Sequence, residues 1–289
     1  MALSENLRGA AFMAGSMTAF TVNDTVMKYL GRDFELFQLL VLRSVGVAVL
    51  LAALAYGSGA MKVRLSRRDW ALVSLRGIAE VVAVFLFLIA LFNMPIANLV
   101  AILQALPLTV SLGAALVLKE VIGWRRITAI LIGLMGVFLI VRPGAEGFTI
   151  YSVFGVLSVL CVTVRDLTVR RISAEVPTAT VTFASALFVL TFAALAATTV
   201  EWKPMASGDW LWLAVAMGFV LCGYQASVLA MRKGDVGFVT QFRYTSLLAA
   251  LLLGLLVFGE WPDGLTLVGA CIVVATGLFT IWRERKVQV

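Results

Sequence analysis

The sequence predicts an all-α membrane protein whose ten transmembrane helices form two inverted five-helix repeats. Three observations lead to this prediction. The chain is 62% hydrophobic and 13% charged, with a mean hydropathy of +1.02, whereas about a quarter of the residues in a soluble domain are charged. Apolar stretches of about 20 residues, each long enough to cross the hydrocarbon core of a bilayer, recur along the chain. A short charged motif occurs twice, half a chain apart.

The duplicated motif reads T-V-x-D-x-x-x-[K/R]. Its copies lie at residues 20–28 (FTVNDTVMK), in the first apolar stretch, and at residues 162–170 (VTVRDLTVR), in the sixth. An aspartate within a span is costly in lipid and is seldom accidental. Its presence in both copies indicates a duplicated membrane domain, in which the polar residues of each copy face something other than lipid.

Hydropathy locates the spans. In chain order we expect them at residues 9–30, 34–57, 71–92, 95–118, 124–142, 150–172, 177–199, 209–231, 235–258 and 262–282. The connections are short, and the natural boundary is the segment 142–147. One repeat should therefore occupy residues 1–142 and the other residues 150–289. Because five is an odd number of spans, the second repeat should enter the membrane in the opposite orientation.

Several spans carry features that support their assignment. Tryptophans, which prefer the membrane interface, lie at or near span ends: Trp70, Trp124, Trp202, Trp210, Trp212, Trp261 and Trp282. Span four should be kinked at Pro107. Spans four and nine both end in an acid, Glu120 and Glu260. Spans five and ten share a Gly-x-Phe pattern and several small residues. These two spans should pack tightly, or form the face of a homodimer, away from any transport pathway.

The distribution of Lys and Arg predicts the orientation. If the N-terminus is cytoplasmic, the cytoplasmic segments hold most of the basic residues, and the opposite side holds Arg32, Arg142 and Lys203. We therefore expect a multi-pass inner-membrane protein with both termini in the cytoplasm. The first span lacks the basic region and cleavage site of a signal peptide, so it should remain as the first helix.

Several classes of function are excluded by what the sequence lacks. There is no His, which removes imidazole from any proton relay, metal site or hydrolytic centre. There is no G-x-x-x-x-G-K-[S/T] loop, so ATP does not drive the protein directly. The net charge of +7 lies in short loops and indicates membrane topology, not nucleic acid. Cys161, Cys222 and Cys271 should be packing residues. We expect no catalytic centre, no metal and no cofactor.

Ionisable residues within the spans are the candidates for function. They are Asp24, Arg43, Arg76, Glu80, Arg165, Asp166 and Arg243. Each would cost about 2.5–3.5 kcal/mol at the bilayer centre, so they should pair or face a wet interior. Helical spacing predicts the pairs Asp24–Lys28, Arg76–Glu80 and Asp166–Arg170. Arg43 and Arg243 have no acid at this spacing and should find partners on other helices or bind an anionic group.

Two interpretations of these residues remain open: substrate binding, and interhelical salt bridges that fix helix register. The residues predicted to line a substrate cavity are Asn23, Asp24, Arg43, Arg76, Glu80, Asn98, Gln104, Tyr224, Gln225, Gln241, Arg243 and Tyr244. Those predicted to form gating or structural pairs are Lys28, Arg165, Asp166 and Arg170. Amides and aromatic rings around a cavity suit a flat heterocycle. Asp24 and Glu80 are candidates for proton coupling, with exchange driven by the substrate gradient as the alternative.

The ten spans, the acid that closes the fourth span of each repeat and the FTVNDTVMK segment together resemble the EamA family of the drug/metabolite transporter superfamily. The resemblance covers the whole chain and implies a secondary transporter that moves a small molecule across the bilayer, with uptake and efflux both open. The motif N-D-x-x-x-K, with Leu42-Arg43 in span two, is similar to riboflavin and S-adenosylmethionine uptake members. We therefore expect riboflavin first, then S-adenosylmethionine, then amino acids or other metabolites. A channel is the alternative from another class.

Overall fold

The structure is a computed structural model that describes residues 2–57, 65–119, 123–142, 149–173, 175–233 and 239–287. Glu120 and most of the predicted boundary segment lie outside these residues. Within them the chain is helical, with no strand, which confirms the predicted all-α class. The helices are α1 (Ala2–Leu30), α2 (Leu36–Gly57), α3 (Arg67–Asn93), α4 (Ile96–Leu103), α5 (Leu106–Leu118), α6 (Trp124–Val141), α7 (Ile150–Val169), α8 (Thr178–Ala196), the 3₁₀ turn η2 (Ala197–Thr199), α9 (Ser207–Lys233), the 3₁₀ turn η3 (Thr240–Tyr244), α11 (Thr245–Leu253), the π-helical turn η4 (Gly254–Phe258) and α12 (Gly264–Val287).

The helices coincide with the expected spans. Seven described segments are long and apolar enough to cross a membrane: Leu36–Ala53, Arg67–Asn93, Ile96–Leu118, Ile150–Val169, Thr178–Thr199, Ser207–Ser227 and Thr240–Phe258. Shorter apolar helices, Ile127–Val141 and Gly264–Thr280, belong to α6 and α12. The first helix, α1, is long, but its charged residues lower its mean hydropathy.

Caps and prolines set several helix boundaries. Ser66 precedes α3, and its Oγ accepts a hydrogen bond of 3.1 Å from the Asp69 backbone N–H, which satisfies a donor that the first turn leaves open. Pro95 and Pro177 stand immediately before α4 and α8, where the fixed φ of proline is tolerated. Gly259 ends η4 with φ of +66°, a left-handed conformation that glycine adopts without strain.

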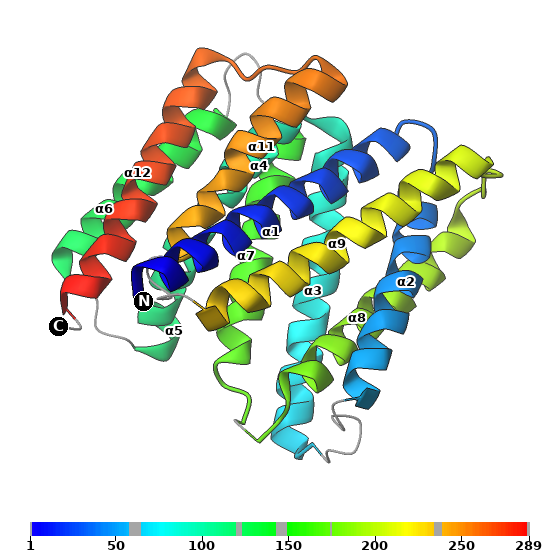
Figure 1. Cartoon of the computed structure of the whole chain (residues 1–289), viewed down its shortest axis with the longest axis horizontal. Coiled ribbons are helices and arrows are strands. Elements are labelled where there is room, and N and C mark those ends of the chain that lie inside the picture. Colours follow the sequence, from blue (N-terminus) through cyan, green and yellow to red (C-terminus); the bar gives the residue numbers. More distant parts are fainter. Residues whose placement is uncertain are drawn as a thin grey trace.

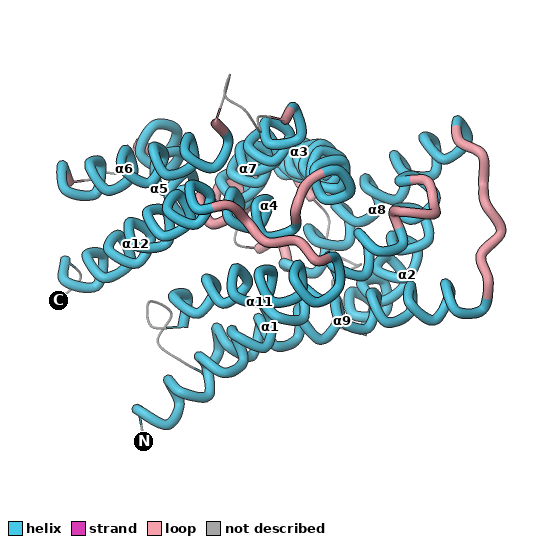
Figure 2. Tube along the Cα trace, turned by 90° about the horizontal axis from the view of Figure 1, so that it is seen from above, coloured by secondary structure: helices cyan, strands magenta, loops and turns pink. Residues whose placement is uncertain are grey.

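Helices of the first half pack mainly against helices of the second half. The most extensive pairs are α1 with α9, α3 with α7, α6 with α12, and α2 with α8 (Figure 1). Viewed from above, α6 and α12 lie at one end of the bundle and α2 and α8 at the other (Figure 2). Between these ends, α1, α11 and α9 lie on one side, and α7 and α3 on the other.

Two of these helix pairs, α1 with α9 and α3 with α7, are each joined by a hydrogen bond of the same kind. The Ser16 hydroxyl of α1 donates to the Gly223 carbonyl of α9, at 2.7 Å. The Ser158 hydroxyl of α7 donates to the Ala83 carbonyl of α3, at 3.0 Å. A hydroxyl that bonds directly to the backbone of a neighbouring helix requires close approach, and such bonds hold transmembrane helices together.

The fourth span is interrupted, as the sequence predicts. α4 ends at Leu103 and α5 begins at Leu106, with Pro107 in its first turn. Because proline has no backbone N–H and its ring collides with the preceding turn, the helix cannot run through this point unchanged. Gln104 lies at the break, and its Nε2 donates to Ser246 Oγ of α11 at 2.9 Å.

The predicted close packing of spans five and ten occurs within one chain, where α6 meets α12. A Cβ atom on Gly136 would lie 2.8 Å from the Gly269 carbonyl oxygen, and one on Gly269 would lie 2.6 Å from the Gly136 oxygen. No ordinary Cβ contact is this short, so both positions require glycine. Because these surfaces cover each other, they are not free to form a dimer face; a homodimer through other surfaces stays a prediction.

This packing gives the first prediction. Gly136→Ala and Gly269→Ala should each lower the thermal unfolding midpoint in detergent, because overpacking a close helix contact costs about 1–3 kcal/mol. Gly218→Ala is the matched control, since no atom lies within 4 Å of a Cβ at this position. The control should be neutral or stabilising, because alanine favours helix over glycine. Equal midpoints for all three variants would contradict the close contact.

Candidate functional site

A cavity of about 330 Å³ lies between α2, α3, α8 and α9, so that each half of the chain contributes two of its walls. Five of the residues predicted to line a substrate cavity line it: Arg43, Arg76, Glu80, Tyr224 and Gln225. Hydroxyls from Ser44, Thr182 and Ser185 join them, and most of the remaining wall is aliphatic. The volume falls in the range of about 300–1,000 Å³ that is usual for small-molecule sites.

The two arginines of this cavity keep unused hydrogen-bond donors. Among the described residues, the Nε atoms of Arg43 and Arg76 are buried and have no hydrogen-bond partner. Arg76 Nη1 donates to Ser185 Oγ of α8. Arg43 is attracted electrostatically by Asp24 of α1, whose Oδ1 accepts a hydrogen bond of 2.8 Å from Asn23 Nδ2. A guanidinium that stays charged and has free donors can bind carbonyl or anionic groups of a ligand.

An ion network joins α3 to α7 beside the cavity. Arg165 Nη1 lies 3.0 Å from Glu80 Oε2, and Arg165 Nε lies 2.9 Å from Asp166 Oδ1. Arg243 of η3 does not line the cavity, but it interacts electrostatically with Asp166 and Arg165. One guanidinium therefore holds two carboxylates, and a second lies close to them. This arrangement gives the carboxylates of α3 and α7 cationic partners, which lowers the cost of ionised groups within the spans.

Two of the pairs predicted from helical spacing differ in the structure. The Asp24–Lys28 pair is wrong, because Lys28 binds Glu260 instead. Glu80 lines the same cavity as Arg76 and attracts it, but its ion-pair partner is Arg165. In both cases a partner on another helix approaches a charge more directly than the neighbour one turn away. For the third predicted pair, Asp166 has Arg165 as a partner, and Arg170 caps the C-terminal end of α7.

The Lys28–Glu260 ion pair closes one end of the bundle. Lys28 is only 7% exposed, and its Nζ lies 2.6 and 2.8 Å from the Glu260 carboxylate oxygens and 2.7 Å from the Met94 carbonyl oxygen. Glu260 Oε2 also accepts a hydrogen bond of 3.1 Å from the Ile96 backbone N–H, at the start of α4. The pair thus ties the end of α1 to the start of α4 and to the segment after η4. The sequence pointed to Glu260 only as a feature of the repeat.

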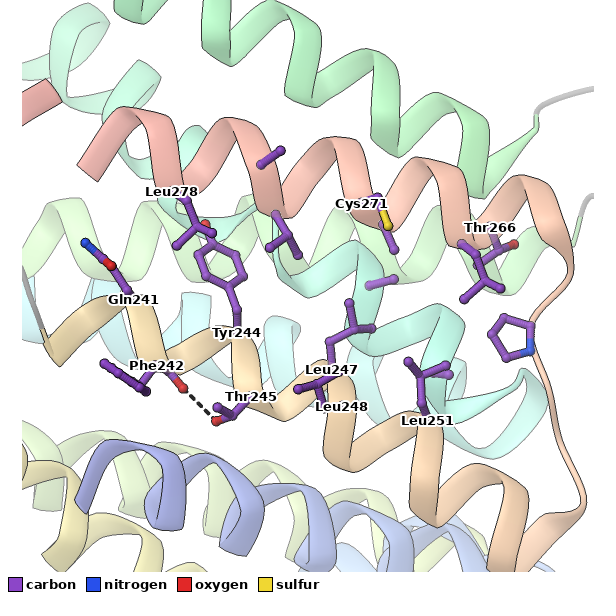
Figure 3. Close-up of a pocket in the computed structure, with 17 residues that line it drawn as sticks. Gln241, Phe242, Tyr244, Thr245, Leu247, Leu248, Leu251, Thr266, Cys271 and Leu278 are labelled. Atoms are coloured by element: carbon purple, nitrogen blue, oxygen red, sulfur yellow. Dashed lines mark hydrogen bonds between the residues drawn. The ribbon is translucent and has the colours of Figure 1, made fainter. Parts of the chain in front are cut away.

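Seven residues predicted for the cavity do not line it: Asn23, Asp24 and Arg243, described above, and Asn98, Gln104, Gln241 and Tyr244. Gln104 bonds to Ser246, and Asn98 borders a small pocket of about 80 Å³ between α4 and α12. Gln241 and Tyr244 line a separate apolar groove of about 470 Å³ between α11, α4 and α12 (Figure 3). The predicted side chains therefore do not converge on one chamber. Gln104, Gln241 and Tyr244 lie at the irregular turns of spans four and nine, where the direction of side chains changes.

A surface ion pair lies beside the small pocket. Arg142 donates to Asp263, which connects the end of α6 to the start of α12. The Thr266 backbone N–H and the Arg142 guanidinium hold the pKa of Asp263 below its ordinary value, because both favour the ionised carboxylate. No three Cys, Asp or Glu side chains come together as metal ligands in the described residues.

Comparison with known proteins assigns the chain to a family. The model of the EamA-like transporter family matches residues 7–142 and again residues 149–282. The chain belongs to the EamA-like transporter family. This EamA-like protein is therefore a multi-pass membrane transporter of the drug/metabolite type, and not an enzyme, as the sequence predicts.

Curated relatives match almost end to end. The riboflavin transporter of Vibrio cholerae is 29% identical over 97% of this chain and 95% of its own length. The S-adenosylmethionine uptake transporter of Rickettsia conorii is 25% identical over 99% of this chain and 96% of its own. The pseudopaline exporter CntI of Pseudomonas aeruginosa is 25% identical over 88% of this chain and 89% of its own. A solved crystal structure, 24% identical, has the same fold with a TM-score of 0.61 over 96% of this chain and 95% of that one.

Proposed function

We propose that this EamA-like protein is a secondary transporter of the bacterial inner membrane that moves a small polar metabolite by alternating access, with riboflavin as the first substrate to test. One observation carries the proposal: a cavity between helices of both halves is lined by Arg43, Arg76 and Glu80 within otherwise apolar spans. Ionised side chains are costly in hydrocarbon, and in membrane proteins they mark solute pathways.

The proposed alternating-access mechanism depends on two inverted repeats, residues 1–142 and 150–289. Three observations support this arrangement. The family model matches each half separately. The Ser16–Gly223 bond between α1 and α9 has a counterpart in the Ser158–Ala83 bond between α7 and α3. The fourth span of each half is irregular, at the α4–α5 break and at η3. Related halves of opposite orientation can supply outward-open and inward-open states of similar energy.

In the proposed cycle, the conformation of this structure corresponds to the state that is open toward the cytoplasm. The cavity extends to Leu51 of α2 and Thr178 of α8, near the basic segment that begins α3. The opposite ends of α2, α3 and α8 are closed by the rings of Phe37, Phe85 and Phe192, whose centroids lie 5.7–6.0 Å apart. If the basic segments are cytoplasmic, then both termini lie in the cytoplasm and the aromatic cluster faces the outside.

The chemistry of the cavity suits a heterocycle with several acceptors. The free donors of Arg43 and Arg76 can bind ring carbonyls, Gln225 can read an imide edge, and the aliphatic walls can cover the ring faces. The isoalloxazine ring of riboflavin has these features, and the Vibrio cholerae relative is a riboflavin transporter. S-adenosylmethionine is the second candidate, because the Glu80 carboxylate provides a partner for its positive charge.

A growth test examines the first substrate. A bacterium that cannot make riboflavin and lacks its own uptake system is expected to grow at low external riboflavin when it expresses this chain. The Arg43→Ala variant, produced at the same level in the membrane, is expected to give no rescue. If wild-type protein that is inserted in the membrane gives no rescue, riboflavin is rejected as the substrate. The same assay in an S-adenosylmethionine auxotroph then tests the second candidate. Saturable counterflow in liposomes distinguishes a carrier from a channel.

A further inference from the structure

A second pocket lies outside the proposed pathway, in the groove between α11 and α12. It holds about 470 Å³ and runs along the length of both helices, from Pro262 at one end to Gln241 and Leu278 at the other. α4 forms its floor through Ala97 and Ala101. Figure 3 shows leucines of α11 and side chains of α12 facing each other across it. We call this the α11–α12 groove.

The groove opens on the outer surface of the bundle, between two apolar segments, Thr240–Phe258 and Gly264–Thr280, that we expect to lie in the bilayer. Leu248 of α11, one of its lining residues, is 66% exposed, and Val268 of α12 nearby is 51% exposed. The exposed thiol of Cys271 also lines the groove. Water does not fill an apolar surface groove inside hydrocarbon, whereas lipid acyl chains do. The occupant that this position and lining favour is therefore a lipid chain.

One polar group distinguishes this groove from a bare lipid-facing surface. Tyr244 is only 8% exposed, and its hydroxyl is buried with no hydrogen-bond partner among the described residues. Its ring points from η3 toward Leu278 of α12 (Figure 3), and the hydroxyl rests against Gly277, where no Cβ could fit. A buried hydroxyl without a partner is unfavourable, so a ligand that accepts a hydrogen bond at this point would be stabilised.

Within the described part of the chain, the polar group without a hydrogen-bond partner lies toward one end of the groove, whereas Thr266, near the Pro262 end, already interacts with Arg142 and Asp263. Gln241 lines the same end as Tyr244, one turn before it. In the sequence, α12 continues past this end with Arg283, Arg285 and Lys286. Basic residues at the membrane surface attract anionic head groups. The groove matches the parts of a phospholipid in order. Its apolar length suits an acyl chain, the hydrogen-bond donor near one end suits an ester group, and the basic residues beyond that end suit the phosphate.

We propose that the α11–α12 groove is a binding site for an anionic phospholipid. One acyl chain lies along Leu248, Leu251 and Val274, and the Tyr244 hydroxyl donates to an ester carbonyl of the same lipid. The site is separate from the cavity between α2, α3, α8 and α9, and it does not depend on which metabolite the protein carries.

Native mass spectrometry of the delipidated protein, titrated with phosphatidylglycerol or phosphatidylcholine, tests the site. Wild-type protein is expected to retain one phosphatidylglycerol molecule in preference to phosphatidylcholine. Tyr244→Phe removes only the hydroxyl and should weaken retention at least threefold. Cys271→Trp fills the groove and should abolish retention. Cys222→Trp is the matched control, since this exposed cysteine lies on α9 outside the groove, and its retention should equal that of wild type.

Three outcomes would overturn the proposal. Equal retention of the two lipids by wild type would mean ordinary boundary lipid. Unchanged retention in both Tyr244→Phe and Cys271→Trp would place the lipid elsewhere. A dimer that Cys271→Trp abolishes, with no lipid retained by the wild type, would mean that a second copy of the chain covers the groove.

Discussion

Arg43→Ala is expected to reduce substrate uptake by about 10- to 100-fold, because a hydrogen bond to a charged group contributes about 1.5–3 kcal/mol and each 1.4 kcal/mol is tenfold. Arg43 lines the cavity with an unused, buried Nε donor, and no ion pair ties it to another helix in the described residues. Its guanidinium is therefore free to hold a substrate. Uptake into inverted and right-side-out vesicles at several substrate concentrations measures the effect.

Two variants separate binding from folding in this experiment. Arg43→Lys keeps the charge but loses the planar fork of donors, so its uptake should lie between wild type and Arg43→Ala. Arg8→Ala removes an exposed arginine near the start of α1 and should leave uptake unchanged. If Arg43→Ala transports normally while its thermal midpoint falls, the residue is a structural partner of Asp24 and not part of the binding site.

The expected spans follow from hydropathy and local chemistry, which act over neighbouring residues. Apolar length locates the helices, and Pro107 locates the interruption of span four, because each effect depends on a short segment alone. The interhelical partners do not follow from such segments. Glu260 lies 232 residues from Lys28, and Glu80 lies 85 residues from Arg165. Spacing of three or four residues finds neighbours on one helix only, and here the better partners lie on other helices.

The position of Tyr244 shows a second limit of prediction from the sequence. The sequence predicted that Tyr244 lines the substrate cavity, whereas it lies in the α11–α12 groove. The reason is the 3₁₀ turn η3, which has about three residues per turn instead of 3.6 and so changes the direction of every side chain along it. Arg43, Arg76 and Glu80 lie in regular helices, where the periodicity holds, and these three do share one cavity.

Lys28→Ala is expected to shift the protein toward the outward-open state. In the present state Lys28 neutralises Glu260 at the end of the bundle that the aromatic cluster also closes. Removing one partner of a buried ion pair costs about 3–5 kcal/mol, because the other charge remains without compensation. That free energy penalises only the state in which this end is closed, so the balance between states should move by about 100-fold or more.

Thiol labelling measures this shift directly. Ser44 lines the cavity, and Ser44→Cys, introduced into a chain without the native cysteines, is a small change. A membrane-impermeant maleimide added outside intact cells should label this cysteine slowly in the wild-type background and much faster with Lys28→Ala. Asp263→Asn is the matched control: it breaks the more exposed Arg142–Asp263 pair at the same end, and such pairs contribute about 0–1 kcal/mol, so labelling should hardly change.

The charge-reversed pair Lys28→Glu with Glu260→Lys should not restore the closed end. The attraction between the two side chains would be kept, but each would meet a backbone group of the wrong kind. A glutamate at position 28 would face the Met94 carbonyl oxygen, and a lysine at position 260 would face the Ile96 N–H. Each contact would bring together two acceptors or two donors. If the reversed pair labels as slowly as wild type, Coulomb attraction alone closes this end, and the backbone of Met94 and Ile96 takes no part.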